Sequence, residues 1–155
     1  MESAVLSHTL EDYMEAIYLI IRQKKVARVK EIAEFLNVKT PSVVDAIAKL
    51  QDMELIEHEK YGYLSLTDKG ISRAELIYQK HTEIYKFLNQ FLGMDDVSSE
   101  RDACGIEHHM CSQTLERITK LMEFIESSPE GYPEWLKRFN SFISKSNGQI
   151  RQRNE

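Results

Sequence analysis

Residues 29–66 have the sequence VKEIAEFLNVKTPSVVDAIAKLQDMELIEHEKYGYLSL, in which two short helical patterns are followed by two strand patterns. The first helix is expected at 29–36. A tight connection at 37–39 leads to Thr40 and Pro41, which are typical of a helix N-cap and of the first helical position. The helix that begins there is expected to turn four apolar side chains inward: Val43, Ala46, Ile47 and Leu50. Two helices joined by a short turn are typical of a helix-turn-helix.

After Met53 the apolar residues alternate with polar ones, which is the period of a β-strand. Strands are expected at 55–59 and 63–66, with 60–62 as the turn of a β-hairpin. Upstream, apolar residues recur at helical spacing across residues 10–21, which indicates an amphipathic helix. The predicted fold class is therefore mainly α, with an N-terminal winged helix-turn-helix of three helices and a hairpin, whose third helix reads the DNA groove.

The distribution of charge is compatible with DNA binding. The chain has 155 residues and a net charge of −5, but basic residues outnumber acidic ones between residues 22 and 49. Phosphate contacts need such a local basic surface, although lysines on an ordinary solvated helix give the same composition. The candidate DNA-binding residues are Arg28, Lys39, Thr40, Pro41, Ser42, Asp45, Lys49 and Lys60. Asp45 would repel phosphate unless it turns aside or accepts a hydrogen bond from a cytosine amino group.

The chain after the hairpin is expected to be all-helical. Thr67 can cap a long helix, expected at 67–92, which Gly93 ends. Two further helices are expected at 97–110 and 112–126. Their apolar faces need a partner, which is either the long helix of the same chain or a second copy in a homodimer.

Three residues at the end of the 97–110 helix have the spacing of metal ligands. Cys104, Glu107 and His108 stand at i, i+3 and i+4, so they project from one helix face. They offer a thiolate, a carboxylate and an imidazole, which are donors that a transition metal takes. Taken alone, Cys104 is most simply a small buried apolar residue.

Three upstream residues extend this candidate metal site. Asp12 and Glu15 repeat the i, i+3 spacing and offer two hard oxygens, and His81 lies on the apolar stripe of the long helix. Each has a simpler interpretation, because acids commonly line the polar side of a helix and a histidine on an apolar stripe is more often a hydrogen-bonded core residue. The joint occurrence of all six groups favours a divided metal site.

We predict three segments in the chain. Residues 1–70 form the winged helix-turn-helix, and residues 71–143 form a helical metal-binding and dimerisation domain that ends in a short amphipathic helix at 135–143. Residues 144–155 are polar and are expected to be a disordered tail.

Several classes of protein are excluded by composition. No apolar run approaches the roughly 20 residues that a membrane-spanning helix requires. The N-terminus is acidic where a signal peptide needs a basic and an apolar region, so we expect a cytoplasmic protein without a membrane partner. Cys104 and Cys111 would lie about 10 Å apart along a continuous helix, which is beyond the reach of a disulfide and predicts free thiols.

Short strings of residues occur in the order found in one family of regulators. They are Glu11-Asp12-Tyr13-Met14-Glu15-Ala16-Ile17-Tyr18, Ile32-Ala33, Pro41-Ser42-Val43, Leu66-Thr67 with Gly70, Lys80-His81, and Asp102-Ala103-Cys104-Gly105-Ile106-Glu107-His108-His109. With these strings the chain resembles the diphtheria toxin repressor and manganese transport regulator family of metal-dependent repressors over roughly residues 8–126. It is similar to the short, two-domain members, which lack the C-terminal barrel domain of the longer ones.

The resemblance implies metal ligands at five positions of the manganese-type members: Asp12, Glu15, His81, Glu107 and His108. A further family glutamate falls where this chain has Cys104. Iron-type members place a cysteine there but carry methionine at the position of Asp12, so the predicted site is a hybrid. The additional metal site of iron-type members lacks its carboxylate near Tyr85, although Glu100 could contribute one.

We therefore expect a metal-dependent transcriptional repressor of metal-uptake genes, and not an enzyme, with operator DNA and a second copy of the chain as partners. Because thiolate favours iron over manganese, Fe(II) is the expected co-repressor and Mn(II) the next candidate. Two alternatives stay open. One is a thiol-based redox regulator in which Cys104 is oxidised, and the other is a small metalloenzyme, although the chain lacks His-Glu-x-x-His.

Overall fold

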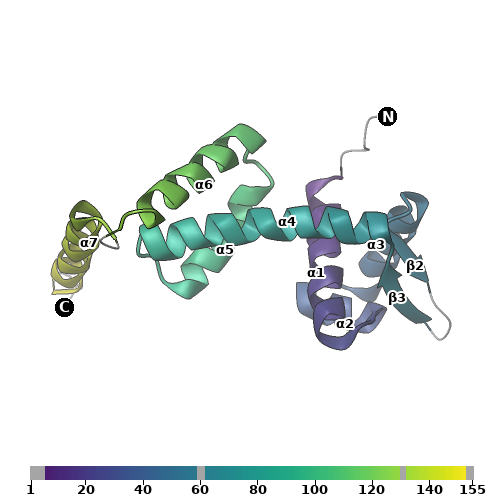
Figure 1. Cartoon of the computed structure of the whole chain (residues 1–155). Coiled ribbons are helices and arrows are strands. Elements are labelled where there is room, and N and C mark those ends of the chain that lie inside the picture. Colours follow the sequence, from purple (N-terminus) through teal and green to yellow (C-terminus); the bar gives the residue numbers. More distant parts are fainter. Residues whose placement is uncertain (1–5, 59–61, 130–131, 153–155) are drawn as a thin grey trace. The chain divides into compact units, whose positions relative to one another are not determined.

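The computed structural model describes residues 6–58, 62–129 and 132–152. The chain divides into two compact units, Met1–Gln79 and Lys80–Glu155. Helices predominate in both units, and a small sheet lies in the first, which confirms the predicted fold class (Figure 1).

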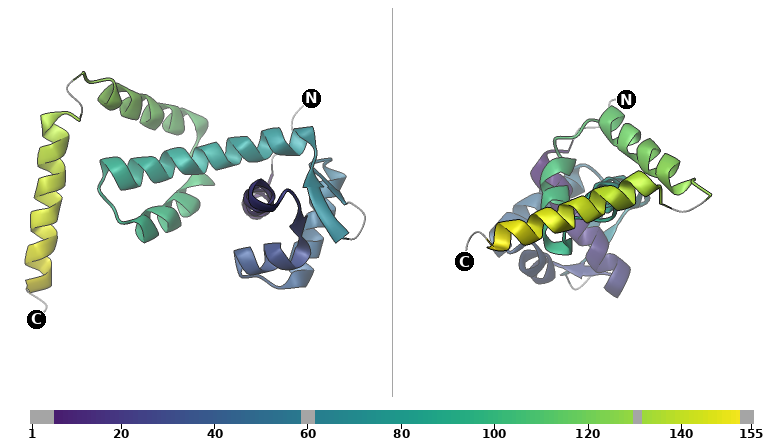
Figure 2. Two further views of the ribbon diagram at one scale, coloured as in Figure 1. Left: turned by 60° about the horizontal axis from the view of Figure 1, so that its bottom comes forward. Right: turned by 90° about the vertical axis from the view of Figure 1, so that its left-hand side faces the viewer.

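The first unit opens with three helices: α1 (His8–Lys24), α2 (Val29–Leu36) and α3 (Thr40–Asp52). The left view of Figure 2 shows α1 nearly end-on. The prediction that Thr40 caps α3 is wrong by one residue, because the N-cap is Lys39. The backbone of Lys39 is extended and its carbonyl oxygen accepts from the amide of Ser42 at 3.0 Å, so Thr40 is already helical.

Three strands complete the first unit. The predicted hairpin is formed by β2 (Ile56–His58) and β3 (Tyr63–Leu66), which are antiparallel. A two-residue strand, β1 (Ala27–Arg28), pairs with the other edge of β3 and gives the order β1-β3-β2. Of the predicted turn at 60–62, Lys60 and Tyr61 lie outside the described residues. Gly62 has a φ of 77°, a conformation that favours glycine.

The core of the first unit joins α1, α2, α3 and β3. Met14, Ile17, Ile32 and Leu64 are fully buried in it. The four residues predicted to face inward from α3, Val43, Ala46, Ile47 and Leu50, all belong to this core. Burying one such side chain contributes roughly 1.5–3 kcal/mol, so the periodic apolar residues are a main source of the free energy that holds the three helices together.

The long helix predicted at 67–92 is present but changes type near its end. It begins as α4 (Asp68–Lys86), and the hydroxyl oxygen of Thr67 accepts from the amide of Gly70 at 2.9 Å, as expected of a cap. It then widens into a π-helix, η2 (Phe87–Phe91). The division between the two compact units falls inside α4, because Ala74 and Ile77 pack into the core of the first unit. The domain boundary at residue 70 stays a prediction.

The second unit also contains α5 (Asp96–Glu107), α6 (Ser112–Glu126) and α7 (Glu134–Gln152). Helix α6 has its predicted bounds, whereas α5 ends three residues before the predicted 110. The amides of His109 and Met110 both donate to the carbonyl oxygen of Ile106, at 3.0 Å each, which closes α5 in a turn. Ile84, Leu88 and Ala103 are buried together between α4, η2 and α5.

Helix α7 continues to Gln152, where the sequence predicted disorder from residue 144. The hydroxyl of Ser144 donates to the carbonyl oxygen of Asn140 at 2.9 Å, so at least one polar side chain of this segment is satisfied by the helix itself. Residues 153–155 lie outside the described part of the chain.

Gly70 supports a test of how the hairpin packs on α4. A Cβ atom at this position would stand 1.8 Å from the carbonyl oxygen of Leu55, so α4 and the backbone before β2 can approach only if residue 70 is glycine. We expect Gly70→Ala to lower the free energy of unfolding by about 2 kcal/mol, as overpacking of a core does. Urea denaturation followed by circular dichroism measures this change.

Gly105→Ala is the matched control, because Gly105 is also helical but a Cβ there meets nothing within 4 Å. It should leave the protein equally stable or more stable by up to about 1 kcal/mol, since alanine has the higher helix propensity. Equal effects of the two substitutions would contradict the close approach at Gly70.

Candidate metal centre

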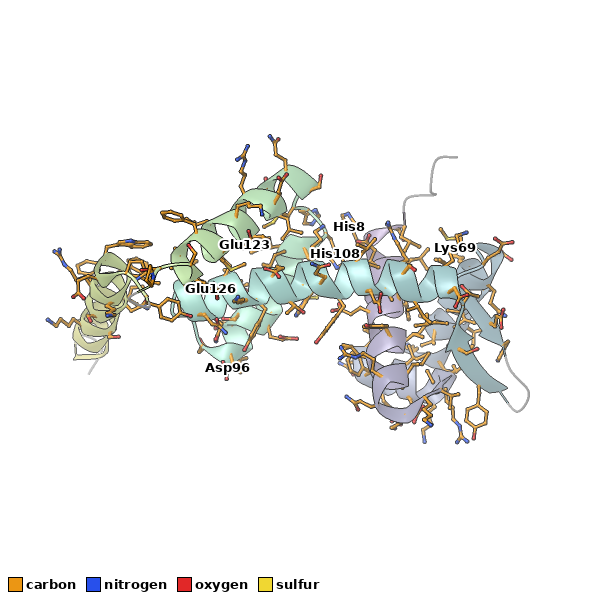
Figure 3. The ribbon with its side chains drawn as sticks, viewed as in Figure 1. His8, Lys69, Asp96, His108, Glu123 and Glu126 are labelled. Atoms are coloured by element: carbon orange, nitrogen blue, oxygen red, sulfur yellow. The ribbon has the colours of Figure 1, made fainter. Side chains whose placement is uncertain are left out.

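The last turn of α5 carries the three predicted metal ligands of the second unit. The donor atoms of Cys104, Glu107 and His108 all lie within 4.8 Å of one another. Cys104 is exposed, whereas Glu107 is only 1% exposed. In Figure 3, Asp96 and His108 mark the two ends of α5. The helical spacing therefore brings these three groups together as predicted.

His81 reaches the same place from α4. Its Nδ1 donates to the Oε2 atom of Glu107 at 2.7 Å, and its Nε2 lies 3.3 Å from the Oε1 atom of Glu100. The residue is 8% exposed. His81 is thus a buried, hydrogen-bonded histidine, and its partner is itself a candidate ligand.

The second carboxylate oxygen of Glu107 is the most informative atom of the centre. Among the described residues, Oε1 is buried and has no hydrogen-bond donor, and Nε2 of His108 lies 3.4 Å from it. Glu107 is also the last residue of α5, where the helix dipole disfavours negative charge. A buried carboxylate oxygen without a donor is costly unless a cation satisfies it. The donor set of the second unit therefore fits a divalent transition metal.

Asp12 and Glu15 belong to the first unit. They stand one helical turn apart on α1, and both are partly buried. Their neighbours Tyr13, Met14 and Ala16 are buried, so the acids lie at the border of the α1 core face. Their carboxylates are hard oxygen donors of the kind that divalent metals accept.

The groups near Tyr85 bear on the additional metal site of iron-type members. The hydroxyl of Tyr85 donates to Oδ1 of Asp96 at 3.3 Å, and Nδ2 of Asn89 donates to the same oxygen at 2.8 Å. Burial and then the charge of Asp96 raise the pKa of Tyr85. Oδ1 of Asp96 therefore already accepts two hydrogen bonds. The carboxylate of Glu100 lies beside a different residue, with its Oε1 atom 3.3 Å from Nε2 of His81.

Most of the predicted DNA-binding residues lie on the surface of the first unit. Arg28, Lys39, Thr40, Pro41, Ser42, Asp45 and Lys49 are exposed, and Lys60 lies outside the described residues. Arg28 on β1 also binds Tyr63 of β3: its guanidinium donates to the phenol oxygen and lies 4.5 Å from the ring centroid. The contact between Arg28 and Tyr63 was not predicted from the sequence. It depends on the pairing of β1 with β3, and a strand of two residues such as β1 is too short to show the period of a strand.

The sequence of residues 5–64 matches the iron-dependent repressor N-terminal DNA-binding domain. Residues 67–136 match the iron-dependent repressor metal-binding and dimerisation domain. The chain belongs to the iron-dependent repressor family. It is a metal-dependent transcriptional repressor of the family typified by the diphtheria toxin repressor and the manganese transport regulator, as its resemblance to that family implied.

Relatives and solved structures agree with this assignment. The chain is 38% identical over 122 residues to the transcriptional regulator MntR of Bacillus pumilus, and this match covers 79% of this chain and 84% of the relative. It is 37% identical over 119 residues to an uncharacterised helix-turn-helix regulator of Methanocaldococcus jannaschii, covering 76% of this chain and 95% of that one.

Among solved structures, IdeR of T. acidophilum is similar at a TM-score of 0.68 and 29% identity, over 79% of this chain and 57% of that one. The manganese regulator SloR is similar at 0.67 and 29%, over 77% and 56%. This chain thus spans little more than half the length of these two structures. Within the described residues, no helix is long and apolar enough to cross a membrane.

The two cysteines allow the ligand role of Cys104 to be tested. Neither cysteine is in a disulfide and both are exposed, so Cys111 serves as an internal control. Hydrogen bonds from the side chain and backbone of Thr114 lower the pKa of the Cys111 thiol, which increases its thiolate fraction near neutral pH. We expect Zn(II) to slow alkylation of Cys104 on the order of tenfold, because a coordinated thiolate is a poor nucleophile, and to leave Cys111 reactive.

Peptide mass spectrometry after timed treatment with iodoacetamide distinguishes the two sites. Equal protection of Cys104 and Cys111, or protection of neither, would show that Cys104 is not a ligand for this metal.

Proposed function

We propose that this repressor controls genes for metal-ion uptake and that Fe(II), or next Mn(II), is its co-repressor. The observation that carries the proposal is the buried Oε1 of Glu107, which has no hydrogen-bond donor among the described residues of a chain with a DNA-binding domain. A regulator of uptake needs an affinity for DNA that rises with metal, and a carboxylate that requires a cation supplies the sensing half of that function.

The proposed ligand set draws on both units. From the first unit it takes Asp12 and Glu15, and from the second His81, Cys104, Glu107 and His108. Each group of donors is supported by its own geometry and by the family resemblance. A bound divalent cation supplies the positive charge that lets several anionic side chains lie together.

The proposed control of DNA binding follows from the distribution of these ligands. When Asp12 and Glu15 share a ligand set with the second unit, they restrict the movement of α1 and of the DNA-binding unit to which it belongs. In a homodimer, this restriction favours arrangements in which the two α3 helices match successive major grooves, roughly 34 Å apart. By linkage, operator DNA must tighten metal binding in return.

The choice of metal rests on ligand softness. The Cys104 thiolate favours iron over manganese, while the carboxylates accept either ion. Both metals occur in the names of similar proteins: the family is called iron-dependent, and SloR is a manganese regulator. Cobalt, nickel and zinc are expected to bind at least as tightly in solution, because intrinsic affinity follows the Irving–Williams order.

The first test removes the candidate ligands of α5. We expect the double substitution Glu107→Ala and His108→Ala to abolish the increase in operator affinity caused by metal, with affinity in chelator unchanged. Anaerobic fluorescence anisotropy at fixed salt measures this, using DNA from upstream of a metal-uptake gene of the source genome with Fe(II), Mn(II) or chelator. Glu123→Ala is the control, because Glu123 pairs with Lys120 on α6.

Metal-dependent binding that survives the double substitution would overturn the proposed site. Equal binding of the unsubstituted protein in chelator and in metal would instead favour the alternative of a thiol-based redox regulator. The observation that supports this alternative is that the thiols of Cys104 and Cys111 are both exposed and open to oxidation.

A second test concerns selectivity. Because a carboxylate is a harder ligand than a thiolate, Cys104→Glu should shift the response from Fe(II) toward Mn(II), by on the order of tenfold in the ratio of the two half-maximal concentrations. The same anisotropy assay measures both responses, and Cys111→Ser is the matched control. If neither response moves, Cys104 does not coordinate the metal.

A further inference from the structure

The outward side of α3 has an unusual composition for a helix that reads DNA. Val43 and Leu50 are fully buried, whereas the adjacent Val44 is 50% exposed. Pro41, Asp45 and Ala48 are exposed beside it. At 3.6 residues per turn, the four outward positions fall within about 100° of the helix circumference. We call this strip of Pro41, Val44, Asp45 and Ala48 the α3 ridge.

The α3 ridge lacks the side chains that usually read purines. Arginine reads guanine, and asparagine or glutamine reads adenine, through paired hydrogen bonds. None of them stands on the ridge, where three members are apolar and the fourth is a carboxylate. The exposed donors Ser42 and Lys49 lie to one side of it, and hydroxyl and ammonium groups commonly contact phosphate.

A single exposed valine on a protein surface is ordinary. Val44 differs because it lies on the third helix of a winged helix-turn-helix, within the match to a DNA-binding domain. The occupant of that surface is therefore the major groove of DNA. Two base edges in the groove match the ridge: the 5-methyl group of thymine is its apolar contact, and the N4 amino group of cytosine donates to a carboxylate.

We infer that Val44 and Asp45 set the base preference of the operator, Val44 by packing on a thymine methyl group and Asp45 by accepting a hydrogen bond from a cytosine amino group in the same half-site. This inference rests on the proposed function as a metal-dependent DNA-binding protein. It predicts half-sites that contain a thymine and a cytosine at a fixed spacing.

The experiment begins without a known operator. Duplexes with a randomised central segment are selected with the full-length protein in the presence of Mn(II), and the enriched half-sites are sequenced. Each thymine of the enriched site is then replaced by deoxyuridine, which removes only the methyl group. At one thymine the affinity of the unsubstituted protein should fall about fourfold, as expected for the lost burial of one methyl-sized group.

Protein variants assign the contact to its residue. In the Val44→Ala variant, the same deoxyuridine replacement should lower the affinity much less, because the thymine methyl group no longer has the valine side chain to pack on. Ile71→Ala is the control, since Ile71 is an exposed aliphatic residue of the same unit on α4.

Asp45→Asn should weaken the preference for cytosine by at least about fivefold and favour adenine, which an amide reads. Asp68→Asn, at an exposed carboxylate on α4, should leave the preference unchanged.

The outcomes separate this inference from the proposed function. Suppose that the protein selects a defined site in a metal-dependent way. If no deoxyuridine replacement then lowers the affinity, or if Asp45→Asn leaves the base preference unchanged, the inference is overturned and the proposed function stands. Failure to enrich any sequence, with binding equal in Mn(II) and in chelator, would overturn both.

Discussion

A carboxylate oxygen that is removed from water without a hydrogen-bond donor must find positive charge, and the second unit is built around such an atom in Glu107. Ile84, Leu88 and Ala103 pack α4 and η2 against α5, and this packing brings His81 to 2.7 Å from the other oxygen of the same carboxylate. The helix end adds a further unfavourable interaction, because the negative pole of α5 lies at the same residue. The apolar packing thus keeps the Glu107 carboxylate buried at a position where a carboxylate is unfavourable.

Local signals predicted much of the fold. Helices α2 and α6 have their expected bounds, and the four apolar residues predicted to face inward from α3 are buried. Features that depend on distant residues were missed. Strand β1 is defined by the pairing of Ala27 and Arg28 with Leu64 and Tyr63 of β3, and two residues are too few to show a period. The widening of the long helix into η2 also lacked a local signal, because its residues are compatible with an ordinary α-helix. The helical continuation of α7 was missed because residues 144–152 are mostly polar and include Asn147 and Gly148, which have low helix propensity.

The candidate site divides in the same way. Cys104, Glu107 and His108 come from one helix, so their spacing alone predicted that they meet. The two carboxylates that flank His81 come from α5 while His81 comes from α4, and only the packing of one helix on another brings them to it. Sequence reasoning also expected Cys104, considered alone, to be buried, whereas its thiol is exposed. The roles of the six candidate ligands, and of the residues predicted to contact DNA, stay predictions.

The single carboxylate on the α3 ridge also has a consequence for the search for an operator in a genome. Most major-groove positions present acceptors, such as the N7 and O6 atoms of guanine, and these repel Asp45. A regulator gains discrimination from contacts that penalise the wrong partner as well as from those that reward the right one. With a net charge of −5, the chain has little general attraction to phosphate to compensate for that repulsion. Under the inference made above for Asp45, fewer copies would be held on the millions of decoy sites that compete with each operator, so a small number of molecules could regulate it.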